Sequence, residues 1–191
     1  YWPTKSSQYG ACDRCGFPKD AFYYWKSVWT EEPVVHVLPH WTWPGKEGEV
    51  LPLEVYSNCE EVEVFVNGLS LGRKYHQKGA ITDYEAVYQP GEVKVVGYCK
   101  DEPVACCQSK TTGEYSAVYL KELYRGTELL LLEADIVDEA GDICPWAENI
   151  LQVEVANGVL LGMENGDPSE EYEEGTNSKK TFHGKAFLMV R

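Results

Sequence analysis

Two tryptophans, Trp41 and Trp43, are the residues whose type and spacing most directly suggest a chemistry. They lie two positions apart, so on an extended segment both rings point to the same side of the chain. Two coplanar aromatic rings can bind a sugar chain by stacking on its apolar C–H faces, and His40 beside them could hydrogen-bond a sugar hydroxyl. The alternative, which we favour, is that these rings pack a β-sandwich against a neighbouring domain.

A second pair, Cys12 and Cys15, has the Cys-x-x-Cys spacing of a redox centre or of half a zinc site. A structural zinc site needs four ligands, and the other cysteines and the four histidines offer no second pair at the usual spacing. Reactive cysteines of the thioredoxin type lie at the start of a helix, whereas residues 16–18 separate this pair from the next helical stretch. We therefore expect neither a metal nor a redox function here.

Acidic residues form two clusters that could attract calcium, the turn at 138–142 and the run at 170–174. The turn lacks the alternating acids and the final glutamate of an EF-hand loop, and the run is more simply a solvated loop. The sequence also contains no nucleophile elbow, no P-loop and no dinucleotide-binding fingerprint. No metal and no cofactor are therefore expected.

The net charge of the chain, −14 at pH 7, repels polyanions and makes nucleic acid a poor partner. No apolar run reaches the roughly 18 residues of a membrane-spanning helix, so no membrane partner is expected. Seven cysteines without the spacing of a disulfide framework slightly favour a cytoplasmic location over a periplasmic or secreted one. The chain begins Tyr1-Trp2-Pro3 rather than with Met, which we interpret as a fragment, so that any targeting signal would lie upstream of it.

One helix is expected, over residues 21–29. Pro18 suits a helix start, because the first turn does not need its missing N–H. Phe22, Trp25 and Trp29 recur at three- and four-residue spacing and give one aromatic stripe. Without a partner domain, this stripe should either fold onto the sandwich that follows or drive association of the isolated chain.

From residue 33 onward, apolar residues alternate with polar ones, which is the pattern of half-buried β-strands. Asn67-Gly68 supplies the positive-φ pair of a tight hairpin. The expected strands are residues 34–38, 51–57, 62–67, 69–74, 84–88 and 92–99, followed beyond a linker at 111–113 by 117–123, 129–137, 151–155, 159–163 and 181–190. Short strands with turn signals between them predict an all-β fold of two immunoglobulin-like β-sandwich domains in tandem, preceded by a short helical segment.

Several motifs follow one another along nearly the whole chain. They are GFPKD (16–20) with Tyr23-Tyr24, LPHWTW (38–43) with GKEG (45–48), VYSNC (55–59), VFVNG (64–68) with Leu71-Gly72, and LGMENGDP (161–168). In this order and combination they resemble the C-terminal part of glycoside hydrolase family 2 proteins of the β-galactosidase type.

The resemblance implies three segments. Residues 1–32 would be the exit of a (β/α)8 barrel with its last helix, residues 33–111 an immunoglobulin-like sandwich, and residues 112–191 an invasin-like sandwich. Trp2 would lie where barrel enzymes place their sites and help to floor the sugar pocket of the longer protein. In this fragment, by contrast, Trp2 would be an inert terminal residue.

The resemblance also implies that the catalytic machinery lies elsewhere. The family uses two glutamates on earlier barrel strands as a retaining pair, with carboxyl groups about 5 Å apart. None of the acidic residues in this chain lies in the family's motif for either role. No catalytic residue is therefore expected here.

These observations predict a non-catalytic C-terminal accessory region of a β-galactosidase-like enzyme that hydrolyses terminal β-glycosides in carbohydrate metabolism. Its expected partner is the catalytic barrel of the same polypeptide, with carbohydrate or an oligomer contact as further partners. Two other functions stay open, an independent carbohydrate-binding module and an adhesin-like immunoglobulin array. The barrel-exit segment argues against the adhesin, which has no use for it.

Overall fold

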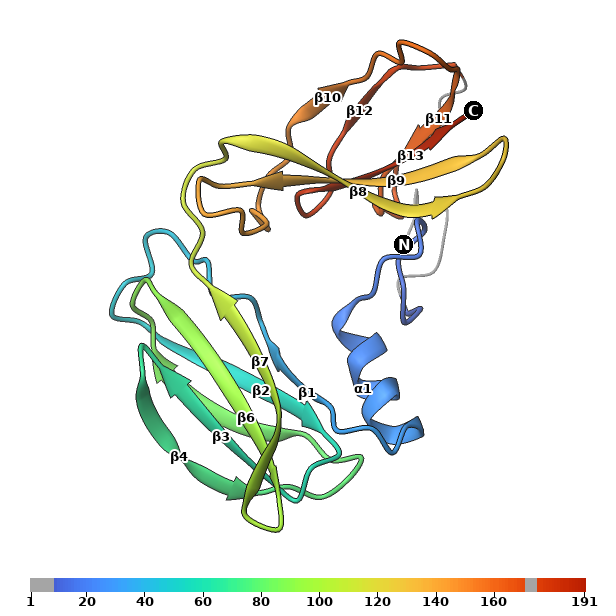
Figure 1. The fold of residues 1–191 in the computed structure, drawn as a ribbon. Helices are drawn as coiled ribbons and strands as arrows, with labels where there is room; N and C mark the ends of the chain where they lie inside the picture. Colours follow the sequence, from blue (N-terminus) through green and yellow to red (C-terminus); the bar gives the residue numbers. More distant parts are fainter. Residues whose placement is uncertain (1–8, 171–174) are drawn as a thin grey trace. The chain divides into compact units, whose positions relative to one another are not determined.

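The computed structural model describes residues 9–170 and 175–191. The chain forms two compact units, one made of Pro18–Thr111 and the other of residues 9–17 together with Thr112–Arg191 (Figure 1). Apart from one short helix, the regular structure of these residues is all strand, so the predicted all-β class is confirmed. The three-segment division at 32 and 111 stays a prediction; in the structure the helix belongs to the first unit and residues 9–17 to the second.

The unit Pro18–Thr111 is a sandwich of two antiparallel sheets. Its elements are α1 (Asp20–Trp29), β1 (Val35–Leu38), β2 (Val50–Ser57), β3 (Glu61–Val66), β4 (Leu69–Tyr75), β5 (Thr82–Val87), β6 (Glu92–Cys99) and β7 (Glu102–Lys110). One sheet has the order β1-β2-β5 and the other β4-β3-β6-β7. Three strands packed against four in this order is an immunoglobulin-like arrangement.

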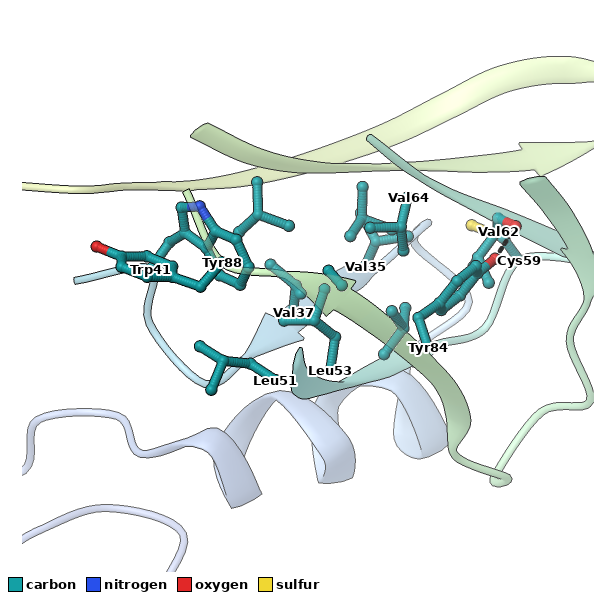
Figure 2. Close-up of a cluster of buried hydrophobic side chains, with 14 residues drawn as sticks. Val35, Val37, Trp41, Leu51, Leu53, Cys59, Val62, Val64, Tyr84 and Tyr88 are labelled. Atoms are coloured by element: carbon teal, nitrogen blue, oxygen red, sulfur yellow. Dashed lines mark hydrogen bonds between the residues drawn. The ribbon is translucent and has the colours of Figure 1, made fainter. Parts of the chain in front are cut away.

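The core of this sandwich follows from the alternation in its strands. Val62 and Val64 of β3 and Val93 and Val95 of β6 have no exposed surface, while the residues between them face outward. The buried side chains of the two sheets meet in one cluster (Figure 2). Within it the hydroxyl of Tyr84 donates to the Val62 carbonyl over 2.8 Å, so this buried polar group is satisfied.

The predicted hairpin turn joins β3 to β4. Asn67 and Gly68 have φ angles of 49° and 81°, the left-handed pair that a two-residue hairpin requires. The Asn67 side chain does more than tolerate this conformation, because its Oδ1 accepts a hydrogen bond of 2.8 Å from the backbone N–H of Glu92. The turn is thereby tied to the start of β6.

Helix α1 packs on β1 and β2 with a face other than its tryptophan stripe. Ser27 is buried, and the Tyr24 hydroxyl donates to the Gly79 carbonyl over 3.0 Å. Trp25 and Trp29 stack on each other at 5.3 Å but stay 42% and 76% exposed. These two rings of the predicted aromatic stripe therefore do not fold onto the sandwich. Association of the chain through them stays a prediction.

The second unit is a smaller sandwich. Its strands are β8 (Ala117–Arg125), β9 (Leu130–Val137), β10 (Ile150–Gln152), β11 (Leu160–Glu164), β12 (Ser178–Lys180) and β13 (Lys185–Val190), in sheets ordered β11-β13-β9-β8 and β10-β12. Ala134, Met163, Ala186 and Leu188 form the main buried cluster, with Leu151 packed against it. Residues 9–17 belong to this unit although more than 90 residues separate them from its first strand.

Two strands, β7 and β12, were not expected from the sequence. β7 is an edge strand that carries Pro103, and most of its residues are exposed, so an apolar alternation is missing. β12 is a three-residue strand inside what reads as a polar loop. Within residues 9–170 and 175–191, no helix is long and apolar enough to span a membrane.

Candidate functional site

Trp41, one of the two predicted sugar-stacking residues, lies inside the first sandwich. Its side chain has no exposed surface, and its ring meets Tyr88 edge-to-face at 5.1 Å (Figure 2). The indole Nε1–H donates to the Gln89 carbonyl over 3.1 Å. No face of this ring is open to a sugar.

Trp43 is half-buried and differs from Trp41 in its surroundings. Its ring stacks on His40 at 4.8 Å, its Nε1–H donates to the His40 carbonyl over 2.7 Å, and the Lys46 ammonium lies 5.3 Å from its centroid. Trp41 and Trp43 do not form a shared flat platform in the structure, because Trp41 is buried and residues 39–49 are a turn-rich loop rather than an extended strand. Sugar binding by Trp43 stays a prediction. The third predicted site residue, Trp2, lies outside the described residues.

In the second unit, Arg14 joins the N-terminal segment to a loop 150 residues further on. Its Nη1 donates to the backbone carbonyls of Asp167 and Glu170 over 2.9 and 2.7 Å, and its Nη2 donates to Glu164 Oε2 over 3.3 Å. A planar guanidinium can make three such bonds from one side chain, which an ammonium cannot do in the same fixed geometry. We call this set of contacts the Arg14 clamp.

The backbone around Arg14 is shaped by Asp13. Its Oδ1 accepts hydrogen bonds of 2.9 Å from the backbone N–H groups of Cys15 and Phe17. Gly166 lies directly against this turn, since a Cβ there would come within 2.0 Å of Asp13 Oδ2. Only glycine therefore allows the loop to approach the segment this closely.

Cys15 lies in this same turn as a protonated thiol. Burial, followed by the negative charges of Asp13 and Glu164, raises its pKa to about 12. A thiol with a raised pKa is neither a nucleophile nor a metal ligand at neutral pH. Among the described residues no group of histidine, cysteine, aspartate or glutamate side chains could hold a metal ion.

The loop that receives Arg14 is itself fixed by buried polar groups. Lys179 is 4% exposed, and its Nζ lies 3.2 Å from Glu170 Oε1 and 3.9 Å from Glu164 Oε1. Asn165 is 1% exposed; its Nδ2 donates to the Lys180 carbonyl over 2.8 Å and also to Glu170. The carbonyls that bind Arg14 are therefore held in place by the fold of the second unit.

Two carboxylates of β9, Glu133 and Asp135, lie close enough to share the ammonium of Lys185, which is 2.8 Å from Asp135 Oδ1 and also contacts Glu133. Burial opposes ionisation of both, but Lys185 and Lys121 outweigh it at Glu133 and lower that pKa, whereas burial prevails at Asp135 and raises its pKa. Their side chains are only 6% and 7% exposed. A catalytic pair must face its substrate, and this pair faces a lysine instead.

Phe17, at the C-terminal end of residues 9–17, lies beside the cluster formed by Glu133, Asp135 and Lys185. Phe17 is 7% exposed, and the Lys185 ammonium lies 5.5 Å from its ring centroid. Residues 9–17 are thus anchored twice, at Arg14 by hydrogen bonds and at Phe17 by burial. The sequence carries no local signal for this, because both anchors depend on contacts with residues more than 140 positions away.

The two units correspond to described families. Residues 123–191 match glycoside hydrolase family 2 C-terminal domain 5, and residues 48–105 match a domain of unknown function, DUF4982. The whole chain is 33% identical to a region making up 23% of Beta-galactosidase BoGH2A of Bacteroides ovatus. It is 32% identical, over 95% of its length, to 19% of a putative beta-glucuronidase of Formosa agariphila.

A solved structure has the same fold along the whole chain. The chain superposes over its full length on a beta-glycosidase from Bacteroides vulgatus, with a TM-score of 0.94 and 34% sequence identity, and covers 25% of that protein. Fold and matches together define an all-β region of a glycoside hydrolase. The chain is a C-terminal region of glycoside hydrolase family 2, and it spans about a fifth to a quarter of the length of the curated relatives named here.

Proposed function

We propose that the chain is a non-catalytic accessory region of a longer enzyme that hydrolyses terminal β-glycosides, and that its second unit braces residues 9–17. The observation that carries this proposal is the Arg14 clamp. Three bonds from one guanidinium join the segment to a loop that is held by its own buried polar network. Hydrogen bonds to charged groups contribute about 1.5–3 kcal/mol each, so the clamp is strong enough to fix the segment.

The position of the brace fits the barrel-exit interpretation. In a (β/α)8 barrel the residues just after a strand build the rim of the active site, and their placement depends on what supports them. In the proposed enzyme, the segment anchored at Arg14 and Phe17 follows the last barrel strand, and Trp2 lies upstream as a pocket residue. The accessory region would then act on catalysis through support rather than through chemistry.

The relatives' names restrict the substrate class of the proposed enzyme. They are a beta-galactosidase, beta-glucuronidases and a beta-glycosidase, so the shared feature is a terminal β-linked sugar. We propose that class for the longer protein. The choice between galactoside and glucuronide would depend on the residues that line the sugar pocket together with Trp2.

A second candidate function, independent carbohydrate binding, keeps one observation in its favour. Trp43 is part-exposed and lies beside His40 and Lys46, which could hydrogen-bond sugar hydroxyls. Against it, Trp41 adds no second ring, and one face of Trp43 is already stacked on His40. A single partly covered ring is a weak platform for a polysaccharide.

Binding of the purified chain to soluble galactans, glucans and mannans separates the two functions. The brace predicts no saturable binding by isothermal titration calorimetry at millimolar sugar. Saturable binding that Trp43→Ala abolishes, while Trp29→Ala leaves it intact, would instead make the chain a carbohydrate-binding module. Trp29 is the matched control because it is an exposed tryptophan in the same unit.

A further inference from the structure

Three asparagines of the chain, Asn67, Asn157 and Asn165, are each followed by glycine. At such a pair the backbone nitrogen of the glycine can attack the asparagine side chain, because glycine has no Cβ to shield that nitrogen. All three asparagines have the same following residue, so the dipeptide alone does not rank them. The structure places the three side chains in different surroundings.

The Asn67 side chain, in the turn between β3 and β4, is held at both of its polar atoms. Its Oδ1 accepts the 2.8 Å hydrogen bond from the Glu92 N–H, and its Nδ2 donates to the Pro90 carbonyl over 3.3 Å. A Cβ on Gly91 would come within 1.9 Å of this Oδ1, so the amide is also closely packed. Ring closure onto the next residue therefore requires the turn to open first.

Asn165 is held by more contacts and is almost completely buried, at 1% exposure. Its Nδ2 donates to the Lys180 carbonyl over 2.8 Å and also to Glu170, and its Oδ1 accepts a bond of 3.0 Å from the Asp167 N–H. The following residue, Gly166, is buried as well. Water reaches this amide only when the surrounding loop opens.

Asn157 lacks this protection. It lies in the turn between β10 and β11, and both Asn157 and Gly158 are exposed. Within residues 9–170 and 175–191, no hydrogen bond is made by the Asn157 side chain. Its amide can therefore turn towards the Gly158 nitrogen while the core of the second unit stays closed.

We propose that Asn157 is a modification site, an asparagine that deamidates with water in the folded protein. The Gly158 nitrogen attacks the Asn157 Cγ, a new C–N bond forms, and the bond between Cγ and Nδ2 breaks. Nδ2 leaves as ammonia, taking the proton that the Gly158 nitrogen loses, and a cyclic imide remains. One water molecule then opens the imide at either of its carbonyls and gives aspartate or isoaspartate.

The reaction changes the charge and the backbone at one end of β11. Either product carries a carboxylate in place of a neutral amide, which adds to the net charge of −14. Isoaspartate also adds a methylene group to the backbone shortly before Val159, which exchanges hydrogen bonds of 2.6 and 2.9 Å with Arg191. This is the opposite end of β11 from Glu164, which belongs to the Arg14 clamp.

The first experiment incubates the full chain at pH 8 and 37 °C and follows each asparagine by peptide mapping with mass spectrometry. Asn157 should deamidate first, and Asn67 and Asn165 should react at least about tenfold more slowly, because each must wait for local opening. A protein isoaspartyl methyltransferase with labelled S-adenosylmethionine should place its label on the peptide that contains residue 157. A rate at Asn67 or Asn165 equal to that at Asn157 would overturn the proposal.

The second experiment repeats the incubation in concentrated urea, which separates the effect of the fold from that of the sequence. Once the chain is unfolded, the rates at the three Asn-Gly pairs should lie within about threefold of one another, because the contacts that protect two of them are gone. If Asn157 stays about tenfold faster than the other two in urea, its selectivity comes from local sequence, and the protection by the fold is refuted.

Asn157→Gln is the matched variant, because glutamine must close a larger ring and reacts far more slowly. It should lose the early gain of negative charge in ion-exchange chromatography, whereas Asn177→Gln, at an exposed asparagine of the same unit, should keep it. Gly158→Ala is unsuitable, since a Cβ there would come within 2.5 Å of the Arg191 carbonyl oxygen. An early charge change that survives in Asn157→Gln would place the reaction at another residue and contradict the assignment.

Discussion

Large aromatic side chains in the first sandwich combine burial with one satisfied polar atom. Trp41 donates its indole N–H to a carbonyl, and Tyr84 donates its hydroxyl to another, while both rings lie in the core. Each such residue contributes a large apolar area without leaving an unpaired donor. This explains why an aromatic-rich sequence does not by itself signal a sugar-binding surface.

Trp41→Ala should destabilise the first unit by about 3–5 kcal/mol, because it removes a fully buried ring and leaves a cavity. Trp43→Ala should cost less than half as much, since that side chain is part-exposed. Urea unfolding followed by far-ultraviolet circular dichroism measures both. Equal costs would show that Trp41 is not the core residue that its burial indicates.

At Asp138 a single carboxylate holds a turn of the second unit. Its Oδ1 accepts bonds of 3.0 Å from the N–H groups of Ala140 and Asp142, and its Oδ2 accepts one of 3.0 Å from Gly113. The Gly113 N–H, followed by the N–H groups of the turn, lowers the pKa of Asp138. Because the folded pKa lies below the unfolded one, the stabilisation is present above the unfolded value and is lost as the pH falls through the folded pKa.

Asp138→Asn should therefore lower the free energy of unfolding by about 1–2 kcal/mol at pH 7, because an amide has one acceptor oxygen where the carboxylate has two. The difference from the wild type should shrink as the pH falls below about 4, where the unfolded carboxyl becomes protonated. Thermal unfolding between pH 3 and 7 checks this. A difference that stays constant over that range would contradict the assignment of the charge.

At the scale of elements, residues 9–17 have no regular hydrogen-bonded ladder of their own and depend on anchors. Arg14 binds one loop and Phe17 lies against the Lys185 cluster. A segment held mainly by side chains opens locally at a cost set by those contacts. Its order therefore depends on the contacts of Arg14 and Phe17 with distant residues of the second unit.

Arg14→Ala should lower the free energy of local opening of this segment by about 2 kcal/mol, which accelerates amide exchange about thirtyfold. The Cys15 and Phe17 amides, bonded to Asp13, report it directly in hydrogen exchange followed by mass spectrometry. Arg14→Lys should recover only part of the protection, because one ammonium does not reproduce the fork.

Arg125→Ala is the matched control, since this arginine of the same unit forms an exposed pair with Glu122. It should leave exchange of residues 9–17 unchanged. Equal acceleration in the Arg14 and Arg125 variants would show that the clamp has no special part in holding the segment.

The elements were predictable where local pattern decides them. Helix α1 and the strands β2, β3, β6 and β9 follow their periodicity closely. Residue placement was less predictable, because burial of Trp41 and the anchoring of Arg14 depend on how distant loops return to the same place. The loop at 39–49 shows the limit, since its backbone turns where two-residue spacing suggested an extended segment.

For the molecule as a whole, the chain carries a net charge of −14 and covers 23% and 19% of two curated relatives. In our proposal the work of such a region is structural, and the chemistry would belong to the rest of a longer polypeptide. The two neighbouring carboxylates of the second unit, Glu133 and Asp135, face Lys185 in a buried cluster. Our account therefore assigns them to stability and not to catalysis.

The most direct test of this account is hydrolysis of chromogenic β-galactoside and β-glucuronide substrates by the purified chain, beside an active family 2 enzyme as positive control. We predict no release of chromophore above the uncatalysed background at any pH between 5 and 8. Saturable turnover that Glu133→Gln or Asp135→Asn abolishes in a folded variant would contradict the central claim and place a catalytic pair within this chain.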